Sequence, residues 1–479
     1  METRLLVRWL AGSLVTVIAA TALGACDRAE GASPTARASS SAAATSSTKA
    51  TGSAAAATSA TPPPAPKRPE KPLNVLLVTI DAMRADMPWS GYPRQIAPRL
   101  TELAKTSVVY EDVRALASYT AQSVSTWLTG QYTSTLYRTG WFFAGYAKSN
   151  VFFPEILQEK GIRTIGVQSH MYFDRGKGIN QGFDVWEMVP GITFDPETDN
   201  HVTSHKTTAL MQELLGKEEN TGGQFFAWTH YTDPHDVYVR HEGCPEEWGK
   251  KNRDRYDCEI HYTDQWVGKL LDWAEKQPWW KDTALIVTSD HGEAFGEHGM
   301  YKHAFELWEV LVRVPLMLHI PGAQPRRISE ARTLIDLAPT IMDLLGQEPL
   351  KQFVGKSLVA EAFGAPPEPR DVLVMELNED SHNPPRRAIV KGDYKLIVYG
   401  RKAGWKHLLF NLAKDPDEDH NLSKKEPEKL EEMKRVFADT FSKIPSVAPY
   451  GGMKLKGGGT ARGPMRPPKT AEPEAEARG

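Results

Sequence analysis

Two short apolar segments that each run into an aspartate constrain the fold of this chain most strongly. The first is Asn74–Ile80, followed by Asp81, and the second is Ala284–Thr288, followed by Ser289 and Asp290. A continuous apolar run of this length is typical of a strand that is buried on both faces. In sheets built from such strands, ligands bind beyond the carboxyl ends of the strands. We therefore expect an α/β fold with a site that includes Asp81 and Asp290.

Further segments of strand and helix alternate along the chain. The other expected strands are 161–167, 224–229 and 314–320, and the expected helices are 97–104, 153–160 and 256–276. This alternation predicts a mostly parallel central sheet flanked by helices. After residue 364, expected strands at 372–377, 388–399 and 408–412 and a helix at 426–442 predict a small C-terminal α+β subdomain.

The N-terminal segment has the layout of an export signal. Arg4 and Arg8 precede an apolar run that closes with Leu23-Gly24-Ala25-Cys26. Small residues before a Cys are typical of a bacterial lipobox, and an ordinary signal peptide with a stray Cys is the alternative. We expect an exported lipoprotein of the bacterial cell envelope, on the periplasmic face or the outer surface, tethered to a membrane by a lipid on Cys26.

Composition sets the limits of the folded part and the class of partner. Residues 27–70 consist largely of Ala, Ser, Thr and Pro, so we expect a disordered linker there, and the tail 451–479 is also expected to be disordered. The net charge of -3 gives no basic field for nucleic acid, so no nucleic-acid partner is expected. Cys244 and Cys258 allow a disulfide, a less favoured metal site, or two free thiols.

Three segments carry the chemistry. Asp290-His291-Gly292-Glu293 offers two metal ligands at a strand end and a Gly that permits a sharp turn. Asp81 fits a ligand or an ordinary turn residue. Thr120 opens the segment 120–130, and it fits a helix cap as well as a nucleophile. Both roles place it where a phosphate or sulfate binds, at a helix N-terminus.

Together these segments resemble the sulfatase branch of the alkaline phosphatase superfamily, over about residues 72–440. Residues 78–86 resemble the first metal segment, and residues 120–130 resemble the nucleophile segment. Thr232-Asp-Pro-His235 resembles the family's His-x-Pro-His element with the first His replaced. Residues 289–293, with His298 and His303, resemble the second metal segment. The resemblance implies an alkaline-phosphatase/sulfatase-like fold with a catalytic domain at 71–364, after a signal peptide at 1–26, and a subdomain at 365–450.

The nucleophile segment departs from the family pattern. Thr120 stands in place of the Cys or Ser of Cys/Ser-x-Pro-x-Arg, and Gln122 and Val124 replace the Pro and the Arg. Threonine cannot be oxidised to formylglycine, so the sulfatase route through that aldehyde is closed. What remains resembles the threonine-using branches, which include phosphodiesterases and phospho-group transferases. In these branches the threonine attacks phosphorus.

The resemblance also implies the roles of individual residues. Asp81, Thr120, Asp290 and His291 would bind a divalent metal ion. Three oxygens and one nitrogen favour Zn or Mn over Ca. The remaining motif residues would hold the substrate, protonate the leaving group or bind a second metal ion. His235, His298 and His303 are the catalytic candidates, His235, Lys302 and His303 are the substrate-binding candidates, and His170 and His230 are weaker ones.

The functional expectation is a metal-dependent ester hydrolase that uses Thr120 as its nucleophile. Phosphodiesters or phosphonates suit this nucleophile best, and sulfate esters remain open. The substrate would be a small-molecule, glycan or lipid ester. Two alternatives stay open: an envelope phospho-group transferase that acts through phospho-Thr120, and a non-catalytic binding protein on the same fold. The sequence leaves the oligomeric state open.

Overall fold

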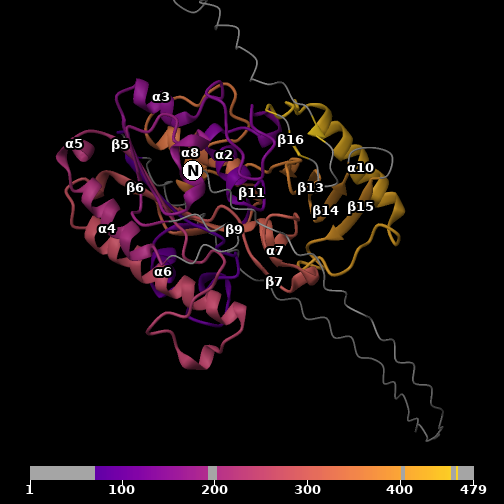
Figure 1. Ribbon diagram of the computed structural model, residues 1–479, viewed down its shortest axis with the longest axis horizontal. Helices are drawn as coiled ribbons and strands as arrows, with labels where there is room; N and C mark the ends of the chain where they lie inside the picture. Colours follow the sequence, from indigo (N-terminus) through magenta and orange to yellow (C-terminus); the bar gives the residue numbers. More distant parts are fainter. Residues whose placement is uncertain are drawn as a thin grey trace, which may run out of the picture. The chain divides into compact units, whose positions relative to one another are not determined.

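A large twisted sheet carries the candidate site at one edge. The computed structural model describes residues 69, 71–192, 202–400, 405–451, 453–454 and 460–461. Within them this sheet has nine strands in the order β10-β2-β9-β6-β1-β5-β3-β4, with β11 also paired to β2. Figure 1 labels β5, β6, β9 and β11 of this sheet. The strands are β1 (Asn74–Ile80), β2 (Val108–Arg114), β3 (Arg163–Gln168), β4 (Val185–Met188), β5 (Phe225–Tyr231), β6 (Thr283–Thr288), β9 (Arg313–His319), β10 (Arg326–Ile328) and β11 (Arg332–Thr333).

The centre of the sheet is parallel, which confirms the expected fold class. β1 lies between β5 and β6 and runs parallel to both, and all of its residues are buried. β9 runs antiparallel to β6 and to β2. Only the hairpin β7 (Ala294–Phe295) and β8 (Tyr301–Lys302) and the short helix α7 (Glu309–Val312) separate β6 from β9. Because no crossover helix returns the chain to the opposite edge, β9 must run back from the edge where β6 ends.

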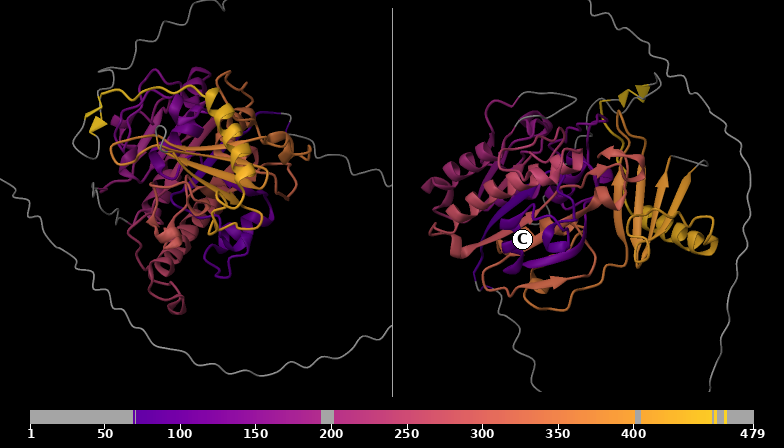
Figure 2. Two further views of the ribbon diagram at one scale, coloured as in Figure 1. Left: turned by 90° about the vertical axis from the view of Figure 1, so that its right-hand side faces the viewer. Right: turned by 90° about the horizontal axis from the view of Figure 1, so that it is seen from below.

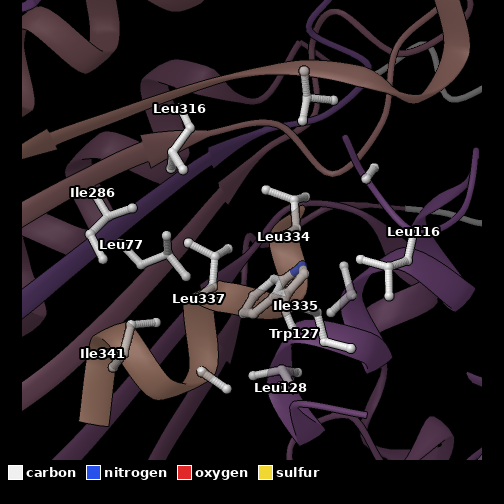
Figure 3. Packing of buried hydrophobic residues seen from close by; sticks show 14 of the residues in the cluster. Leu77, Leu116, Trp127, Leu128, Ile286, Leu316, Leu334, Ile335, Leu337 and Ile341 are labelled. Carbon is white, nitrogen blue, oxygen red and sulfur yellow. The ribbon is translucent and has the colours of Figure 1, made fainter. Parts of the chain in front are cut away.

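Helices cover both faces of the sheet (Figure 2). One face packs against α2 (Thr120–Thr129), α3 (Phe153–Glu159), α8 (Leu337–Leu344) and α9 (Val359–Ala362). The other face packs against α1 (Pro98–Lys105), α4 (Ser204–Leu215) and α6 (Asn252–Ala274), and the short helix α5 (Glu218–Thr221) follows α4. Successive side chains of β1 point to opposite faces of the sheet, so this strand contributes to both cores. Leu77 belongs to the first core and Leu76 to the second. Figure 3 shows the first core, where Leu77 of β1 and Ile341 of α8 lie near Trp127 of α2.

The C-terminal region forms a second, antiparallel sheet in the order β12-β13-β14-β15. Its strands are β12 (Leu373–Leu377), β13 (Arg386–Lys391), β14 (Tyr394–Tyr399) and β15 (Lys406–Asn411), and α10 (Pro427–Ser442) follows them. Ile389 and Leu409 pack with Phe437 of α10. Met375 and Ala388, on alternate positions of the same strands, join the first core of the main sheet. This small sheet is therefore a layer between α10 and the larger domain.

A buried group of charges also joins the two sheets. Lys395 of β14 lies 2.9 Å from Glu309 of α7 and 2.9 Å from Glu418. Arg114 at the end of β2 pairs with the same Glu309 at 2.8 Å. Buried charges are tolerated when each one has a partner, and here the partners come from both sheets.

Some predicted segments lie outside the described residues. They include the signal peptide 1–26 with Cys26, nearly all of the linker 27–70, and most of the tail 451–479. Within the tail, β16 (Met453–Lys454) pairs with β17 (Thr460–Ala461). In the part of the chain that is described, no helix is both long and apolar enough to cross a membrane.

Candidate active site

Four predicted metal ligands meet at the carboxyl ends of β1 and β6. Asp81, Asp290 and His291 are fully buried, and each offers a ligand atom within 4.8 Å of the others. His291 Nε2 lies 3.3 Å from Asp81 Oδ1, 3.4 Å from Asp290 Oδ2 and 3.3 Å from Thr120 Oγ1. The residues that the sequence assigns to one metal ion are therefore neighbours, although Thr120 comes from the first turn of α2.

The polar atoms of this cluster fit a divalent cation. Asp81 Oδ1 and Asp290 Oδ2 are buried, and neither accepts a hydrogen bond from the described residues. Such atoms are costly to bury unless a cation binds them. His291 Nδ1 donates to the Gly292 carbonyl at 2.9 Å, so the lone pair of the neutral ring is on Nε2, which faces the carboxylates. Burial lowers the pKa of His291, which favours this neutral form.

A chain of buried hydrogen bonds orients the Asp81 carboxylate. His230 Nε2 lies 3.1 Å from Asp81 Oδ2, and His230 Nδ1 lies 2.7 Å from Thr79 Oγ1. Trp228 Nε1 donates to the same Thr79 oxygen at 2.9 Å. The register of β1 on β5 sets Thr79 opposite His230, which brings these side chains together. His230 was only a weak candidate in the sequence analysis. Its position at the end of a buried strand is the signal that could have identified it as a site residue.

The charges around Asp81 keep it ionised. Burial alone would raise the pKa of Asp81, but His235 and the hydrogen-bonded His230 outweigh burial and hold this pKa well below its ordinary value. An ionised, oriented carboxylate is the form that binds a metal ion.

Thr120 is held at the start of a helix. Tyr119 before it is extended, with φ -159° and ψ 156°, and the helix α2 begins at Thr120. Ser123 Oγ, in the same first turn, donates to the Asp290 carbonyl at 2.6 Å and joins α2 to the metal loop. The free N–H groups and the dipole of a helix N-terminus favour an anion beside Thr120.

The replacement of the family motif has a structural consequence at Gln122. Gln122 Nε2 donates to the Tyr119 hydroxyl at 2.7 Å, and the Asn378 N–H donates to Gln122 Oε1 at 2.9 Å. The Tyr119 hydroxyl in turn donates to Asp380 Oδ2 at 2.8 Å. The loop after β12 therefore braces the turn that carries Thr120. Val124, which stands where the family has Arg, is buried in the first core.

Three further imidazoles line the approach to this cluster. The ring centroids of His303 and His291 are 4.3 Å apart, those of His235 and His303 are 4.8 Å apart, and those of His170 and His235 are 5.2 Å apart. His170, a weak candidate from the sequence, is thus part of the site. Burial is the largest influence on His170 and lowers its pKa to about 3, so this ring is neutral.

Glu293 completes a buried acid–imidazole pair that the sequence analysis did not assign. Both Glu293 oxygens lie 3.2 Å from His303 Nδ1. Burial alone would lower the pKa of His303, but Glu293 outweighs burial and raises it to about 8. His303 is therefore charged near neutral pH, with Nε2–H as its remaining donor. An acid two residues after a predicted ligand was the only sequence signal for Glu293.

Lys302 and His298 contact residues outside the metal cluster. Lys302 is exposed and forms an ion pair with Asp236, next to His235. His298 is exposed and stacks on Trp308, with 4.0 Å between ring centroids. It lines a pocket of 570 Å³ together with Arg84 and other charged residues. Within the described residues, no hydrogen bond or ion pair connects His298 or Lys302 to the metal cluster.

A disulfide fastens the segment that follows His235. Cys244 and Cys258 are joined, with 5.6 Å between their Cα atoms, which excludes the metal-site and free-thiol alternatives in this structure. Cys258 belongs to α6, so the bond ties the segment after β5 to a long helix.

Comparison with protein families gives two matches. A family model described as "Sulfatase" matches residues 73–347. A second, described as "N-sulphoglucosamine sulphohydrolase, C-terminal", matches residues 296–443.

Similar proteins and structures agree with these family matches. Choline-sulfatase of Rhizobium meliloti is 32% identical over 181 residues, which cover 37% of this chain and 34% of that protein. The chain thus spans about a third of the length of that relative. A "Sulfatase" of Formosa agariphila is 23% identical over 78% of this chain and 88% of its own. A 2-O GAG sulfatase has a TM-score of 0.65 at 17% identity, over 78% of this chain and 93% of its own. The phosphonate monoester hydrolase of Agrobacterium radiobacter has a TM-score of 0.62 at 18% identity, over 82% of this chain and 100% of its own.

Proposed function

The chain belongs to the sulfatase family, and we propose that it is an ester hydrolase with Thr120 as the nucleophile and a divalent metal ion as the cofactor. Asp81, Thr120, Asp290 and His291 would hold the ion, with Zn or Mn favoured. The observation that carries this proposal is the convergence of a threonine hydroxyl and one imidazole nitrogen with two buried carboxylate oxygens that accept no hydrogen bond from the described part of the chain.

Phosphorus esters fit this nucleophile better than sulfate esters. Threonine cannot be oxidised to formylglycine, so the covalent intermediate cannot be released by collapse of an aldehyde hydrate. Its release requires that water attack the phosphorus or sulfur atom bound to Thr120. A threonine or serine hydroxyl can attack phosphorus, and the ester that forms can then be hydrolysed by attack on the same atom. A phosphonate monoester hydrolase is among the proteins of similar fold, and sulfatases are among the relatives. We propose a phosphodiester or phosphonate as the substrate, with sulfate esters as the competing class.

In the first step Thr120 forms a bond to phosphorus. The Thr120 hydroxyl releases its proton to water, Oγ1 bonds to phosphorus, and the bond from phosphorus to the leaving oxygen breaks. A bound metal ion would lower the pKa of the hydroxyl and stabilise the negative charge that develops. The N-terminus of α2 favours the same charge. The leaving oxygen takes the proton of His303 Nε2. The His303 imidazole carries this proton near neutral pH because Glu293 raises its pKa to about 8.

In the second step water restores the enzyme. Water attacks the phospho-Thr120 ester and gives a proton to His303, so the imidazolium is regenerated. The bond between Thr120 Oγ1 and phosphorus breaks, and Oγ1 regains a proton from solvent. The net reaction is hydrolysis of one ester bond by one water molecule. His235, whose ring lies 4.8 Å from that of His303, would contact the non-bridging oxygens.

The test compares wild type with Thr120→Ala on an aryl phosphodiester, an aryl phosphonate and an aryl sulfate, with the metal ion supplied. Loss of turnover of the phosphorus esters in Thr120→Ala is the expected result. In trapped wild type, peptide mass spectrometry should find on Thr120 the phosphoryl or phosphonyl group of the substrate with its remaining substituent. The exposed Thr106 gives the matched control, since Thr106→Ala removes the same group at the end of α1, which packs on the opposite face of the sheet from α2. Turnover of sulfate alone that survives Thr120→Ala would show that water or another residue attacks.

We also propose that the protein is a lipid-anchored component of the bacterial cell envelope. The support is the sequence Leu23-Gly24-Ala25-Cys26 after an apolar segment. Cys26→Ala should either release the protein into the soluble fraction or leave its signal peptide uncleaved. Retention of a normally processed protein in the membrane fraction would contradict the lipid attachment.

A further inference from the structure

We infer that Arg84 is a positioning residue, which holds Glu293 in place and thereby aligns the proton donor His303. This inference rests on the proposed ester hydrolysis and adds a residue to it. Arg84 lies three residues after Asp81, on the loop that follows β1. Its Nη1 donates to the Glu293 carbonyl at 2.7 Å and to Glu297 Oε1 at 2.7 Å. Arg84 therefore joins the loop after β1 to the loop after β6.

Arg84 is itself held in one orientation. Its Nε and Nη2 donate to the two carboxylate oxygens of Asp86 at 2.8 Å and 3.1 Å. This two-point contact fixes the plane of the guanidinium group. Arg253 of α6 donates to the same Asp86 at 2.8 Å, so a long helix supports that carboxylate. The Arg84 side chain is only 13% exposed, so water competes little for its hydrogen bonds.

The loop after β6 is held by side chains along its backbone. Each of the four carbonyl groups of residues 290–293 accepts a hydrogen bond from a side chain. In chain order the donors are Ser123, Ser289, His291 and Arg84. The carbonyls of the proposed metal ligands Asp290 and His291 thus do not depend on Arg84, whereas that of Glu293 does. A change at Arg84 should disturb Glu293 and leave the metal ligands in place.

The position of Glu293 determines where His303 is held. Both Glu293 oxygens lie 3.2 Å from His303 Nδ1, and the hairpin of β7 and β8 separates the two residues along the chain. Glu297 lies in the turn of this hairpin, where its Oε2 accepts the Phe295 N–H at 2.6 Å. Arg84 therefore holds the hairpin both at its start and in its turn. Displacement of a catalytic group by about 1 Å lowers the rate by about 100-fold.

The experiment compares the nitrophenyl and phenyl esters of one phosphonic acid, which differ in how strongly the leaving oxygen needs a proton. Arg84→Lys keeps the charge, but one ammonium group cannot reproduce the fork that bridges Asp86 and Glu293. It should lower kcat/KM about 100-fold on the phenyl ester. The loss should be much smaller on the nitrophenyl ester, whose leaving oxygen departs without a proton. Metal content after dialysis should equal that of wild type.

Arg94→Lys is the matched control. Arg94 Nη1 donates to Asp254 and to Asp257 at 2.8 Å each, and among the described residues it has no hydrogen bond to residues 290–303. This variant should leave kcat/KM on both esters unchanged.

Free guanidinium ion gives a second measurement, because the pocket of 570 Å³ is lined by Arg84 and Asp86 and admits a small cation. In Arg84→Ala, guanidinium chloride at a concentration that leaves wild type folded and active should raise kcat/KM on the phenyl ester about tenfold. This is the gain expected from one restored charge-assisted hydrogen bond. Ammonium chloride, which lacks the planar fork, should not have this effect.

Three outcomes overturn the inference. They are an equal loss on both esters in Arg84→Lys, a loss of metal together with activity, and no recovery of Arg84→Ala with guanidinium ion. Turnover that survives Thr120→Ala would instead contradict the proposed mechanism. If wild type turns over neither ester, amide hydrogen exchange still tests the contact. The Phe295 amide should then exchange about tenfold faster in Arg84→Lys than in wild type or Arg94→Lys, and unchanged exchange would refute the inference.

Discussion

Gly292, between the proposed metal ligand His291 and the acid Glu293, offers a strict test of how the metal loop is held. Its amide donates to the Leu311 carbonyl at 2.7 Å. A Cβ atom added at Gly292 would lie 2.2 Å from the Val310 carbonyl oxygen and 3.3 Å from Leu311 Cα. Both neighbours are backbone of α7, so no flexible side chain can move aside. In Gly292→Ala the loop must retreat from α7 by about 1 Å to reach an ordinary carbon–oxygen contact.

This displacement has two expected effects. Overpacking of this kind lowers the free energy of unfolding by about 1–3 kcal/mol. A shift of about 1 Å in a catalytic group lowers kcat/KM by about 100-fold, because His291 and Glu293 flank the altered residue. Gly223→Ala is the matched control, since nothing lies within 4 Å of a Cβ atom added there. It should change stability by less than about 1 kcal/mol, in the stabilising direction.

The assays are urea unfolding of both variants, metal content after dialysis, and kcat/KM on a phosphorus ester. Wild-type stability, metal content and activity in Gly292→Ala would refute the described packing of the metal loop on α7. Loss of stability with unchanged metal content and activity would show that the strain is relieved away from His291.

Three further perturbations follow from the buried contacts. His230→Ala removes the partner of Asp81 Oδ2, so metal affinity measured by competition titration should fall about 10- to 100-fold; unchanged affinity would mean that Asp81 is oriented without it. Burial is the main reason that the pKa of Glu418 rises from 4.5 to about 7, so the folded state favours the protonated acid and stability should decrease as pH rises through this window. Glu418→Gln should flatten that decrease in urea unfolding at a series of pH values, and an unaltered slope would contradict the assignment. Replacing both disulfide cysteines with serine should cost about 3 kcal/mol of unfolding free energy, for a bond between residues 14 apart; a variant as stable as wild type would show that the segment after β5 is held without the bond.

Much of the fold could be predicted from local pattern. Apolar runs located β1 and β6 to within one residue, and the alternation of strand and helix indicated the layered α/β class. Helical periodicity located α6, although the observed helix begins four residues earlier, at Asn252. The antiparallel direction of β9 was not predicted, because it depends on the lack of a crossover helix rather than on the apolar character of the strand itself. Strand β2 and helices α4 and α8 were also missed.

Some residues of the candidate site could be predicted from the sequence, and others depend on the tertiary structure. Asp81, Asp290 and His291 follow strands whose ends meet at one edge of the sheet, so their convergence followed from the sequence pattern. The pairing of His303 with Glu293 depends on how the β7–β8 hairpin folds back, and the role of His230 depends on the register of β5 on β1. Lys302 and His298 share the motif of His303 but have left-handed φ values of 66° and 54° and lie exposed, with no hydrogen bond or ion pair to the cluster among the described residues.

The sequence by itself limited the chemistry that we propose: it has a threonine where formylglycine would otherwise form, and it offers three oxygens and one nitrogen for a metal ion. It did so because residue identity sets nucleophilicity and ligand type whatever the surroundings. Tertiary structure alone decided which imidazoles reach the cluster and which aromatic rings stack beside the start of α2. Tyr119, Phe142 and Phe305 lie far apart along the chain, and their stacking depends on strand order and loop packing. Local periodicity specifies the two faces of an element but not the neighbours that each face will meet.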